Sequence, residues 1–121
     1  MFEISVEETF AAAHALRNYR GKCERLHGHN YRVRLVVESS GLDSAGLLMD
    51  FVELKRLLHG VIEKLDHQLL NEVTPFDSVN PTAENMAKFF HDEISAVLPP
   101  PVRLSAVKIW ETETSAATYR P

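Results

Sequence analysis

The stretch FAAAHALRNYRGKCERLHGHNYRVRLVV, residues 10–37, contains His14, His27 and His29 together with Cys23, the only cysteine of the chain. Side chains two positions apart on an extended backbone leave the same face, so His27 and His29 can point at one ion while His14 approaches from another segment. Neutral imidazoles suit zinc, and three of them leave a fourth position for water or a substrate. Nickel, copper and iron also accept imidazole ligands. The stretch therefore predicts a three-histidine metal site with an open position.

Alternating apolar residues on both sides of the loop in this stretch predict two strands. The first begins near Phe2 and is expected to end at His14. The second is expected to begin at the motif His27–Gly28–His29 and to continue through Val37. A turn rich in serine, glycine and aspartate follows at residues 39–46.

Two amphipathic helices are expected in the middle of the chain. Asp50 is a suitable N-cap for the first helix, whose apolar residues recur at helical spacing until the helix ends near Asp66. Thr82 is a suitable N-cap for the second helix, and the prolines at 99–101 stop it.

The order strand, strand, helix, helix, strand, strand predicts an α+β fold. Residues 102–119 supply the last two strands, with a polar corner at residues 111–114. Because the strands at each end of the chain are adjacent in sequence, they favour hairpins, and hence an antiparallel four-stranded sheet with two helices on one face. We expect residues 1–121 to form one domain. The two edges of such a sheet would be removed if subunits associated into a barrel.

Composition narrows the functional classes. A net charge of −4 argues against nucleic acid as a partner, because nucleic-acid-binding proteins usually carry an excess of lysine and arginine. No stretch approaches the roughly 20 apolar residues that span a bilayer, so no membrane partner is expected. The N-terminal residues 1–4 do not resemble a secretion signal, and a single cysteine forms no intramolecular disulfide. We therefore expect a cytoplasmic protein.

Four further short segments, combined with the histidine stretch, make up a set of motifs that occurs in a known family. Together with the segments MDF (49–51), LDH (65–67), NPTAE (80–84) and ET (111–112), the stretch from Phe10 resembles the 6-pyruvoyltetrahydropterin synthase superfamily over nearly the whole chain. Its spacing C-x3-H-G-H is similar to that of the branch whose members form 6-carboxy-5,6,7,8-tetrahydropterin in the biosynthesis of queuosine and other 7-deazapurines. Pyruvoyl-forming members more usually place five residues between the cysteine and H-G-H.

This resemblance implies a reaction, a cofactor and an assembly. The reaction converts 7,8-dihydroneopterin triphosphate to 6-carboxy-5,6,7,8-tetrahydropterin and releases acetaldehyde and triphosphate. The cofactor is Zn²⁺, bound by His14, His27 and His29. The assembly is the tunnelling fold, in which three four-stranded subunits close a barrel and two trimers form a homohexamer with active sites between subunits.

The resemblance also implies roles for the remaining site residues. Cys23 corresponds to the proton-abstracting cysteine of the family, and Asp66 with His67 to the relay that serves it. Glu111 corresponds to the glutamate that accepts N–H groups of the pterin ring, and it is sometimes counted in the relay as well. Thr82, besides its expected role as a helix cap, is a candidate for contact with the substrate.

The chemistry of the cysteine and the metal agrees with these roles. A thiol accepts a proton only as the thiolate, and its pKa of about 8.5 falls beside cations such as Lys22, Arg25 and a metal ion. Lys22 is also a candidate for contact with the triphosphate. A zinc ion acts as a Lewis acid that makes the neighbouring C–H bond of the substrate more acidic.

Three alternatives remain open from the sequence. The same residues suit a pyruvoyl-forming or side-chain-cleaving pterin synthase. A non-catalytic zinc module is also possible if Cys23 is the fourth ligand of a closed site. Zinc-dependent hydrolysis fits three histidines but does not need Asp66, His67 or a thiol. A cupin site also begins with H-x-H, but residues 30–35 lack the glutamate that such a site requires.

Overall fold

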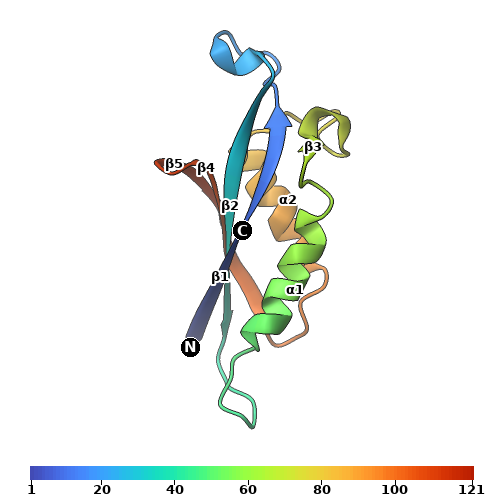
Figure 1. The fold of residues 1–121 in the computed structure, drawn as a ribbon. Coiled ribbons are helices and arrows are strands. Elements are labelled where there is room, and N and C mark those ends of the chain that lie inside the picture. Colours follow the sequence, from blue (N-terminus) through green and yellow to red (C-terminus); the bar gives the residue numbers. More distant parts are fainter.

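A long antiparallel hairpin forms the centre of the molecule (Figure 1). The computed structural model describes residues 1–121, and its first strands are β1 (Phe2–His14) and β2 (His27–Ser39). Their register runs without interruption from the pair Phe2–Ser39 to the pair His14–His27. Both predicted strand limits at the histidines are therefore confirmed.

The sheet has five strands in the order β3-β1-β2-β4-β5. The strands β4 (Arg103–Thr112) and β5 (Ser115–Tyr119) extend the hairpin antiparallel, as predicted. The prediction of a purely antiparallel, four-stranded sheet is wrong, because β3 (Gln68–Leu69) pairs parallel to residues 12 and 13 of β1. A strand of two residues has no alternating pattern that the sequence could reveal.

Two helices and two short 3-10 turns complete the chain. Helix α1 (Phe51–Ile62) is capped by Asp50, whose Oδ1 accepts the Val52 amide at 2.8 Å. Helix α2 (Ala83–Ser95) is capped by Thr82, whose Oγ1 accepts the Asn85 amide at 3.1 Å. Both predicted caps are confirmed. The 3-10 turns are η1 (Lys22–Glu24) and η2 (Leu70–Glu72).

Helix α1 ends at Ile62, four residues before the predicted end at Asp66. The amides of Lys64 and Leu65 bond to the carbonyls three residues earlier, at 3.1 and 2.9 Å, so the chain leaves the helix through a tighter turn. The chain then turns at His67, whose φ of 58° lies in the left-handed region, and enters β3. The early end of α1 is what places residues 66 and 67 at the edge of the sheet.

Both helices cover the same face of the sheet, as predicted (Figure 1). The core between them is a single cluster of buried apolar side chains, in which Phe10 stacks on Tyr31 with ring centroids 5.1 Å apart and Phe90 of α2 lies 5.9 Å from Phe10. This aromatic end of the core leads directly to the histidines of β1 and β2. No helix is long and apolar enough to cross a membrane.

The opposite face of the sheet has no helix over it and is polar. On this face Trp110 has the guanidinium of Arg32 3.8 Å and the ammonium of Lys108 4.6 Å from its ring centroid. Glu7 accepts from Arg34 at 2.6 Å and from Arg32 at 3.2 Å. These hydrogen bonds, led by the one from Arg34, hold the pKa of Glu7 below its usual value.

Candidate metal and catalytic site

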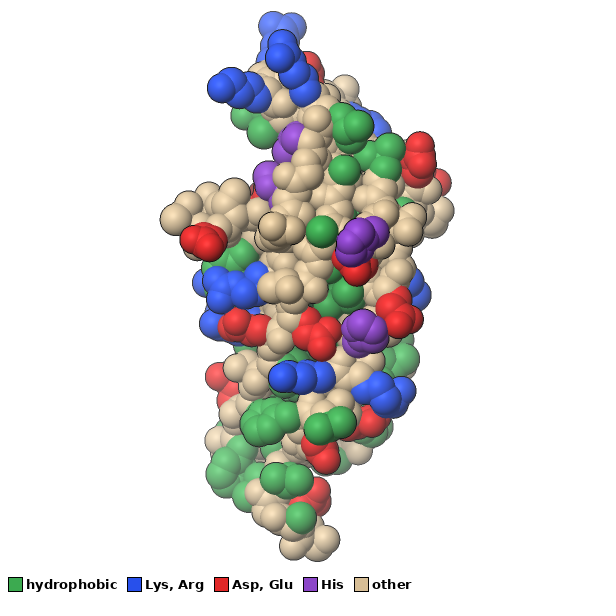
Figure 2. Space-filling view, in the orientation of Figure 1, with side chains coloured by type: hydrophobic (Ala, Val, Ile, Leu, Met, Phe, Trp, Pro, Cys, Tyr) green, Lys and Arg blue, Asp and Glu red, His purple; other side chains and the backbone are tan.

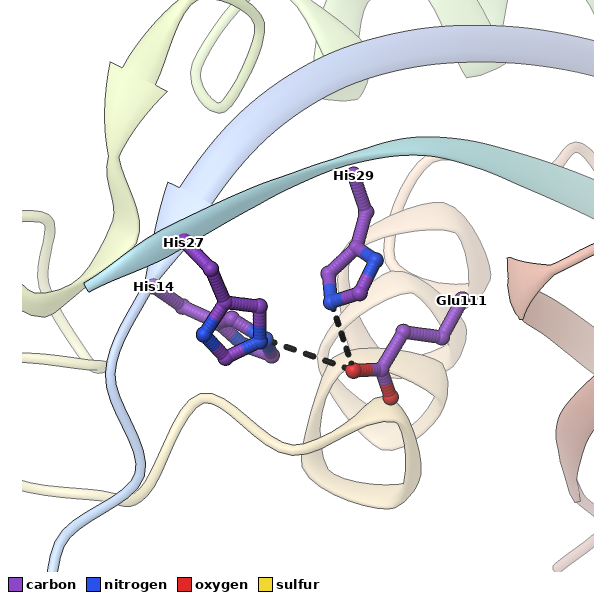
Figure 3. Close-up of side chains that lie close together, drawn as sticks. All are labelled: His14, His27, His29 and Glu111. Carbon is purple, nitrogen blue, oxygen red and sulfur yellow. Dashed lines mark hydrogen bonds and ion pairs between the residues drawn. The ribbon is translucent and has the colours of Figure 1, made fainter. Parts of the chain in front are cut away.

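The register of β1 and β2 brings the three histidines to one place. Residues directly opposite each other in an antiparallel pair lie on the same face, and His14 is opposite His27 while Ala12 is opposite His29. All three imidazoles therefore point to the helix-covered side, just beyond the aromatic core (Figure 3). The ring centroid of His14 lies 4.6 Å from that of His27 and 5.1 Å from that of His29.

Two backbone carbonyls fix the orientation of two of these rings. His14 Nδ1 lies 2.7 Å from the carbonyl oxygen of Pro81, and His27 Nδ1 lies 2.6 Å from that of Arg25. A carbonyl oxygen only accepts, so each Nδ1 carries the proton and donates it. The lone pair of each neutral ring is then on Nε2, which is the arrangement that metal-bound histidines adopt.

The Nε2 atoms lie closer together than is favourable for neutral imidazoles with no proton or cation between them. His14 Nε2 and His27 Nε2 are 3.0 Å apart, although neither has a proton to donate to the other while both rings are neutral. His29 Nε2 is buried and makes no hydrogen bond. A cation among these three nitrogens would satisfy all of them, and imidazole nitrogen is a preferred ligand of zinc. The residues present therefore fit a zinc ion.

The sequence predicted Glu111 in the site, but not its position directly beside the histidines. Its Oε1 lies 2.8 Å from His29 Nε2 and 3.3 Å from His14 Nε2 (Figure 3). The 2.8 Å contact is an ion-pair distance but lacks the direction of an N–H hydrogen bond, so His29 remains without a hydrogen-bond partner. The ligand atoms of His14, His27, His29 and Glu111, hereafter the metal-binding group, all lie within 4.8 Å of one another.

The alternation of β4 directs Glu111 to the histidines. Val107 and Ile109 are buried in the core, and Glu111 is the next residue of the same alternating set, so its side chain leaves the sheet on the helix-covered face. The pairing of β4 with β5 shifts between Trp110 and Thr112, so Glu111 lies at an irregularity of that pair. The Glu-Thr motif assigned Glu111 to the site, but the sequence did not show how closely it approaches the histidines.

The surroundings keep the imidazole of His29 neutral. Burial lowers its pKa, and the neighbouring rings of His14 and His27 lower it further, although Glu111 acts in the opposite direction. Burial, reinforced by the Glu111 carboxylate, raises the pKa of Tyr31, so this phenol stays protonated. The Tyr31 hydroxyl lies 3.2 Å from His14 Nδ1. A neutral His29 retains the lone pair that a metal requires.

Cys23 is separate from the metal-binding group. It lies in η1 of the loop between β1 and β2, is partly exposed, and lines neither of the clefts described below. Its backbone is fixed by one hydrogen bond, from the Leu16 amide to the Cys23 carbonyl at 2.8 Å. Figure 2 shows lysine and arginine side chains gathered over this loop, where Lys22 and Arg25 are exposed.

Asp66 and His67 form a pair of their own at the edge of β1. Asp66 Oδ1 accepts the Ala11 amide at 3.0 Å and lies 3.0 Å from His67 Nδ1. The Ala11 amide, followed by His67, holds the pKa of Asp66 below its usual value, so the carboxylate stays charged. His67 itself is 82% exposed, with a backbone in the left-handed region that non-glycine residues adopt rarely.

Two clefts adjoin the metal-binding group and share His29. One, of about 770 Å³, is lined by Glu111, Trp110 and Arg32 among others. The second, of about 500 Å³, is lined by the small residues at 11–13 of β1 and by His67. Thr82 lines neither cleft, and its hydroxyl oxygen serves as the cap of α2.

Comparison with known proteins agrees with this architecture. The family model for 6-pyruvoyl tetrahydropterin synthase matches residues 3–121, and the chain belongs to this family. It is 37% identical to a 6-carboxy-5,6,7,8-tetrahydropterin synthase of Bacillus subtilis, over 99% of this chain and 86% of the relative. It is 39% identical to a dihydroneopterin monophosphate aldolase of Pyrococcus furiosus, over 85% of this chain and 83% of the relative. The structure of Caenorhabditis elegans 6-pyruvoyl tetrahydropterin synthase superimposes with a TM-score of 0.90 at 27% identity, covering 99% of this chain and 95% of the other.

Proposed function

We propose that this protein is a zinc-dependent carbon–carbon lyase that converts 7,8-dihydroneopterin triphosphate to 6-carboxy-5,6,7,8-tetrahydropterin, with release of acetaldehyde and triphosphate, in queuosine biosynthesis. The observation that carries the proposal is the convergence of three imidazole Nε2 atoms, two of them with fixed lone pairs, in a member of this pterin synthase family. The relative in Bacillus subtilis bears the name of this activity.

His14, His27 and His29 are the proposed zinc ligands. A bound zinc ion would supply Lewis acidity, which makes the C–H bond next to a polarised oxygen easier to ionise. The carbonyls of Pro81 and Arg25 hold the rings of His14 and His27, so the protein orients its ligands before any metal arrives.

Cys23 is the proposed base that removes a proton from the side chain of the substrate. Its loop carries the exposed cations Lys22 and Arg25, and a thiol accepts a proton as the thiolate. Asp66, charged and 3.0 Å from His67 Nδ1, holds the His67 ring with Nε2 free to exchange a proton with substrate or thiol. A relay of this kind would return protons to the side chain as the carbon–carbon bond breaks.

Glu111 is the proposed anchor of the pterin ring, whose N–H groups its carboxylate would accept. Its side chain is 28% exposed and lines a cleft large enough for a pterin. We further propose that the exposed ammonium of Lys22 contacts the triphosphate and that the Thr82 hydroxyl, already accepting the Asn85 amide, donates its proton to substrate.

The proposed assembly is a hexamer of two trimeric barrels. The outer edge of β1 at residues 2–10 and the outer edge of β5 have no strand beside them within the chain. Pairing of these two edges between subunits would close a barrel and satisfy their backbone groups. His67, 82% exposed in one chain, would then meet the Cys23 loop of a neighbouring subunit.

Two other outcomes use the same residues. Triphosphate elimination without cleavage would give the pyruvoyl product, and the structure of the C. elegans synthase is close to this fold. Side-chain cleavage without the carboxyl product would resemble the activity named for the P. furiosus aldolase. How the intermediate is held decides among them.

Product analysis tests the proposal. Zinc-loaded protein is incubated anaerobically with 7,8-dihydroneopterin triphosphate, and products are identified by mass spectrometry, with metal-free protein and the Cys23→Ala variant as controls. We expect 6-carboxytetrahydropterin and acetaldehyde from the wild type alone. A pyruvoyl product would assign the chain to the sister branch, and unchanged substrate from folded, zinc-loaded protein would contradict an enzymatic role.

A further inference from the structure

The loop that carries Cys23 is attached to the rest of the molecule at its first three residues. Asn71 of η2 reaches this loop with its side-chain amide: Asn71 Oδ1 accepts the Ala15 amide at 2.9 Å, and Asn71 Nδ2 donates to the Ala15 carbonyl at 2.8 Å. The side chain thus bonds to both backbone groups of one residue, as a neighbouring β-strand would.

Asn80 repeats this arrangement two residues further along the loop. Asn80 Oδ1 accepts the Arg17 amide at 2.9 Å, and Asn80 Nδ2 donates to the Arg17 carbonyl at 2.9 Å. The guanidinium of Arg17 adds a hydrogen bond to the Phe76 carbonyl at 2.8 Å. Two asparagines from one surface segment, residues 71–80, therefore hold alternate residues of the loop.

The residue between these two attachments reaches Cys23. In an extended backbone the hydrogen-bonding groups of successive residues point to opposite sides. With Ala15 and Arg17 facing the asparagines, the Leu16 amide faces the other way and donates to the Cys23 carbonyl at 2.8 Å. The position of Cys23 thus depends on Leu16, and the position of Leu16 depends on the two asparagines.

The same segment also orients a metal ligand. Pro81, directly after Asn80, accepts the Nδ1 proton of His14 at 2.7 Å. Asn80 is itself fixed, because its carbonyl accepts from Asn85 Nδ2 of α2 at 2.9 Å. One anchored stretch of chain therefore sets both the ring of His14 and the start of the Cys23 loop.

We propose that Asn71 and Asn80 are positioning residues that hold Cys23 at a fixed place relative to the metal-binding group. This inference rests on the proposed role of Cys23 as the base. Asparagine suits the task because it carries one donor and one acceptor on a short side chain, whereas aspartate would set a second acceptor against the carbonyl of Ala15 or Arg17. Neither asparagine touches the metal-binding group through its side chain.

The experiment uses Asn71→Asp, which preserves the side-chain volume, together with Asn71→Ala and Asn80→Ala. The exposed neighbour Glu72→Gln is the matched control, because it lies in the same 3-10 turn. Hydrogen exchange of the amides of residues 15–17 is measured by mass spectrometry on zinc-loaded protein. We expect exchange at least about tenfold faster at Ala15 in Asn71→Ala and at Arg17 in Asn80→Ala, because each amide loses its acceptor, and no change in Glu72→Gln.

Steady-state kinetics supply the second readout. A displaced base lowers the rate of the chemical step by about 100-fold, so kcat should fall by this order while KM changes by less than about threefold and zinc content stays constant. A purely structural role would instead reduce the amount of folded, zinc-loaded protein and leave kcat per loaded site unchanged.

Each result decides one part of the inference. Unchanged exchange at Ala15 in Asn71→Ala and at Arg17 in Asn80→Ala would overturn the proposed attachment, whether or not the wild type is active. Faster exchange with unchanged kcat in these zinc-loaded variants would overturn the positioning role. Absence of turnover in the wild type would contradict the proposed function instead, and the exchange measurement would still show whether the asparagines hold the loop.

Discussion

The metal-binding group and the proposed proton-transfer residues, Cys23, Asp66 and His67, are built in opposite ways. The histidines stand on two paired strands, and each Nε2 lies within a few ångströms of the next in a single chain. The proton-transfer residues stand on a loop and on a turn, His67 is largely exposed, and Cys23 lies in neither cleft beside the metal-binding group. If the proposed function holds, we expect one subunit to suffice for metal binding and catalysis to need the proposed assembly.

Removal of one imidazole should have the largest effect. We expect His29→Ala to lower zinc affinity by more than about 100-fold, because one of three nitrogen ligands is lost. Loss of a residue that only orients a ligand already lowers metal affinity by about 10–100-fold. Turnover should disappear with the metal. Zinc content after dialysis against a zinc buffer, measured by elemental mass spectrometry, checks this, with the exposed helix residue His59→Ala as a matched control.

If His29→Ala retained stoichiometric zinc, the metal would be held elsewhere and the comparison would fail. A low-pH titration sharpens the test. Metal competes with protons for the imidazoles, so acidification should release zinc from the wild type.

Replacement of the thiol should impair the proposed proton transfer and leave the metal-binding group unchanged. Cys23→Ala is expected to lower kcat by about 10²–10⁴-fold, the contribution of a general base, while zinc content and the free energy of unfolding stay near the wild-type values. Stopped-assay kinetics on zinc-loaded protein measure the loss. A variant that unfolds and loses zinc would show instead that Cys23 is a fourth ligand of a structural site.

Mixed assemblies test whether the two regions meet between subunits. Cys23→Ala and His67→Ala chains, coexpressed with different tags, should regain about a quarter of the wild-type activity, because random mixing places an intact cysteine beside an intact histidine at that fraction of interfacial sites. Each variant expressed alone should be inactive. A mixture no more active than either variant would show that both residues act from the same chain.

The smallest effect is expected at Asp66, which acts through His67. Asp66→Asn should lower kcat by about tenfold, because His67 Nδ1 loses its charged partner. The Ala11 amide, and then His67, lower the pKa of Asp66 below its usual value of 3.8, so the charged form stabilises the fold at neutral pH. This stabilisation is lost as the pH falls through the lowered pKa.

Urea denaturation at two pH values checks the sign of that effect. The variant should be less stable than the wild type at pH 7, and the difference should shrink below pH 3.8, where the unfolded wild-type carboxyl becomes protonated. A difference that grew on acidification would contradict this account of Asp66.

The paired strands were the most predictable part of the molecule. Alternation of apolar residues fixed the face and the limits of β1 and β2, because a shift of one residue would expose their whole buried set. The caps at Asp50 and Thr82 were equally readable, since both use side-chain oxygens that satisfy free amides. The strand β3 was missed because its two residues are held only by tertiary pairing with β1.

The surroundings of the candidate site were less predictable. Alternation along β4 gives the face of Glu111, but its approach to the histidines depends on the pairing of β4 beside β2, which one sequence does not show. The attachments of Asn71 and Asn80 to the Cys23 loop join residues more than 50 positions apart, and an asparagine in a surface segment is an ordinary observation by itself. Such long-range contacts follow from packing and not from local spacing.

The sequence by itself determined the hairpin, the helices, the family and the common face of His27 and His29, because these depend on periodicity and on residues close together in the chain. The tertiary structure decided that His14 completes the cluster with a fixed tautomer, that Glu111 joins it, and that His67 and the thiol stay apart from it. The physical reason is that register, bulges and hydrogen bonds between distant segments place side chains to within ångströms, whereas sequence spacing gives only their direction.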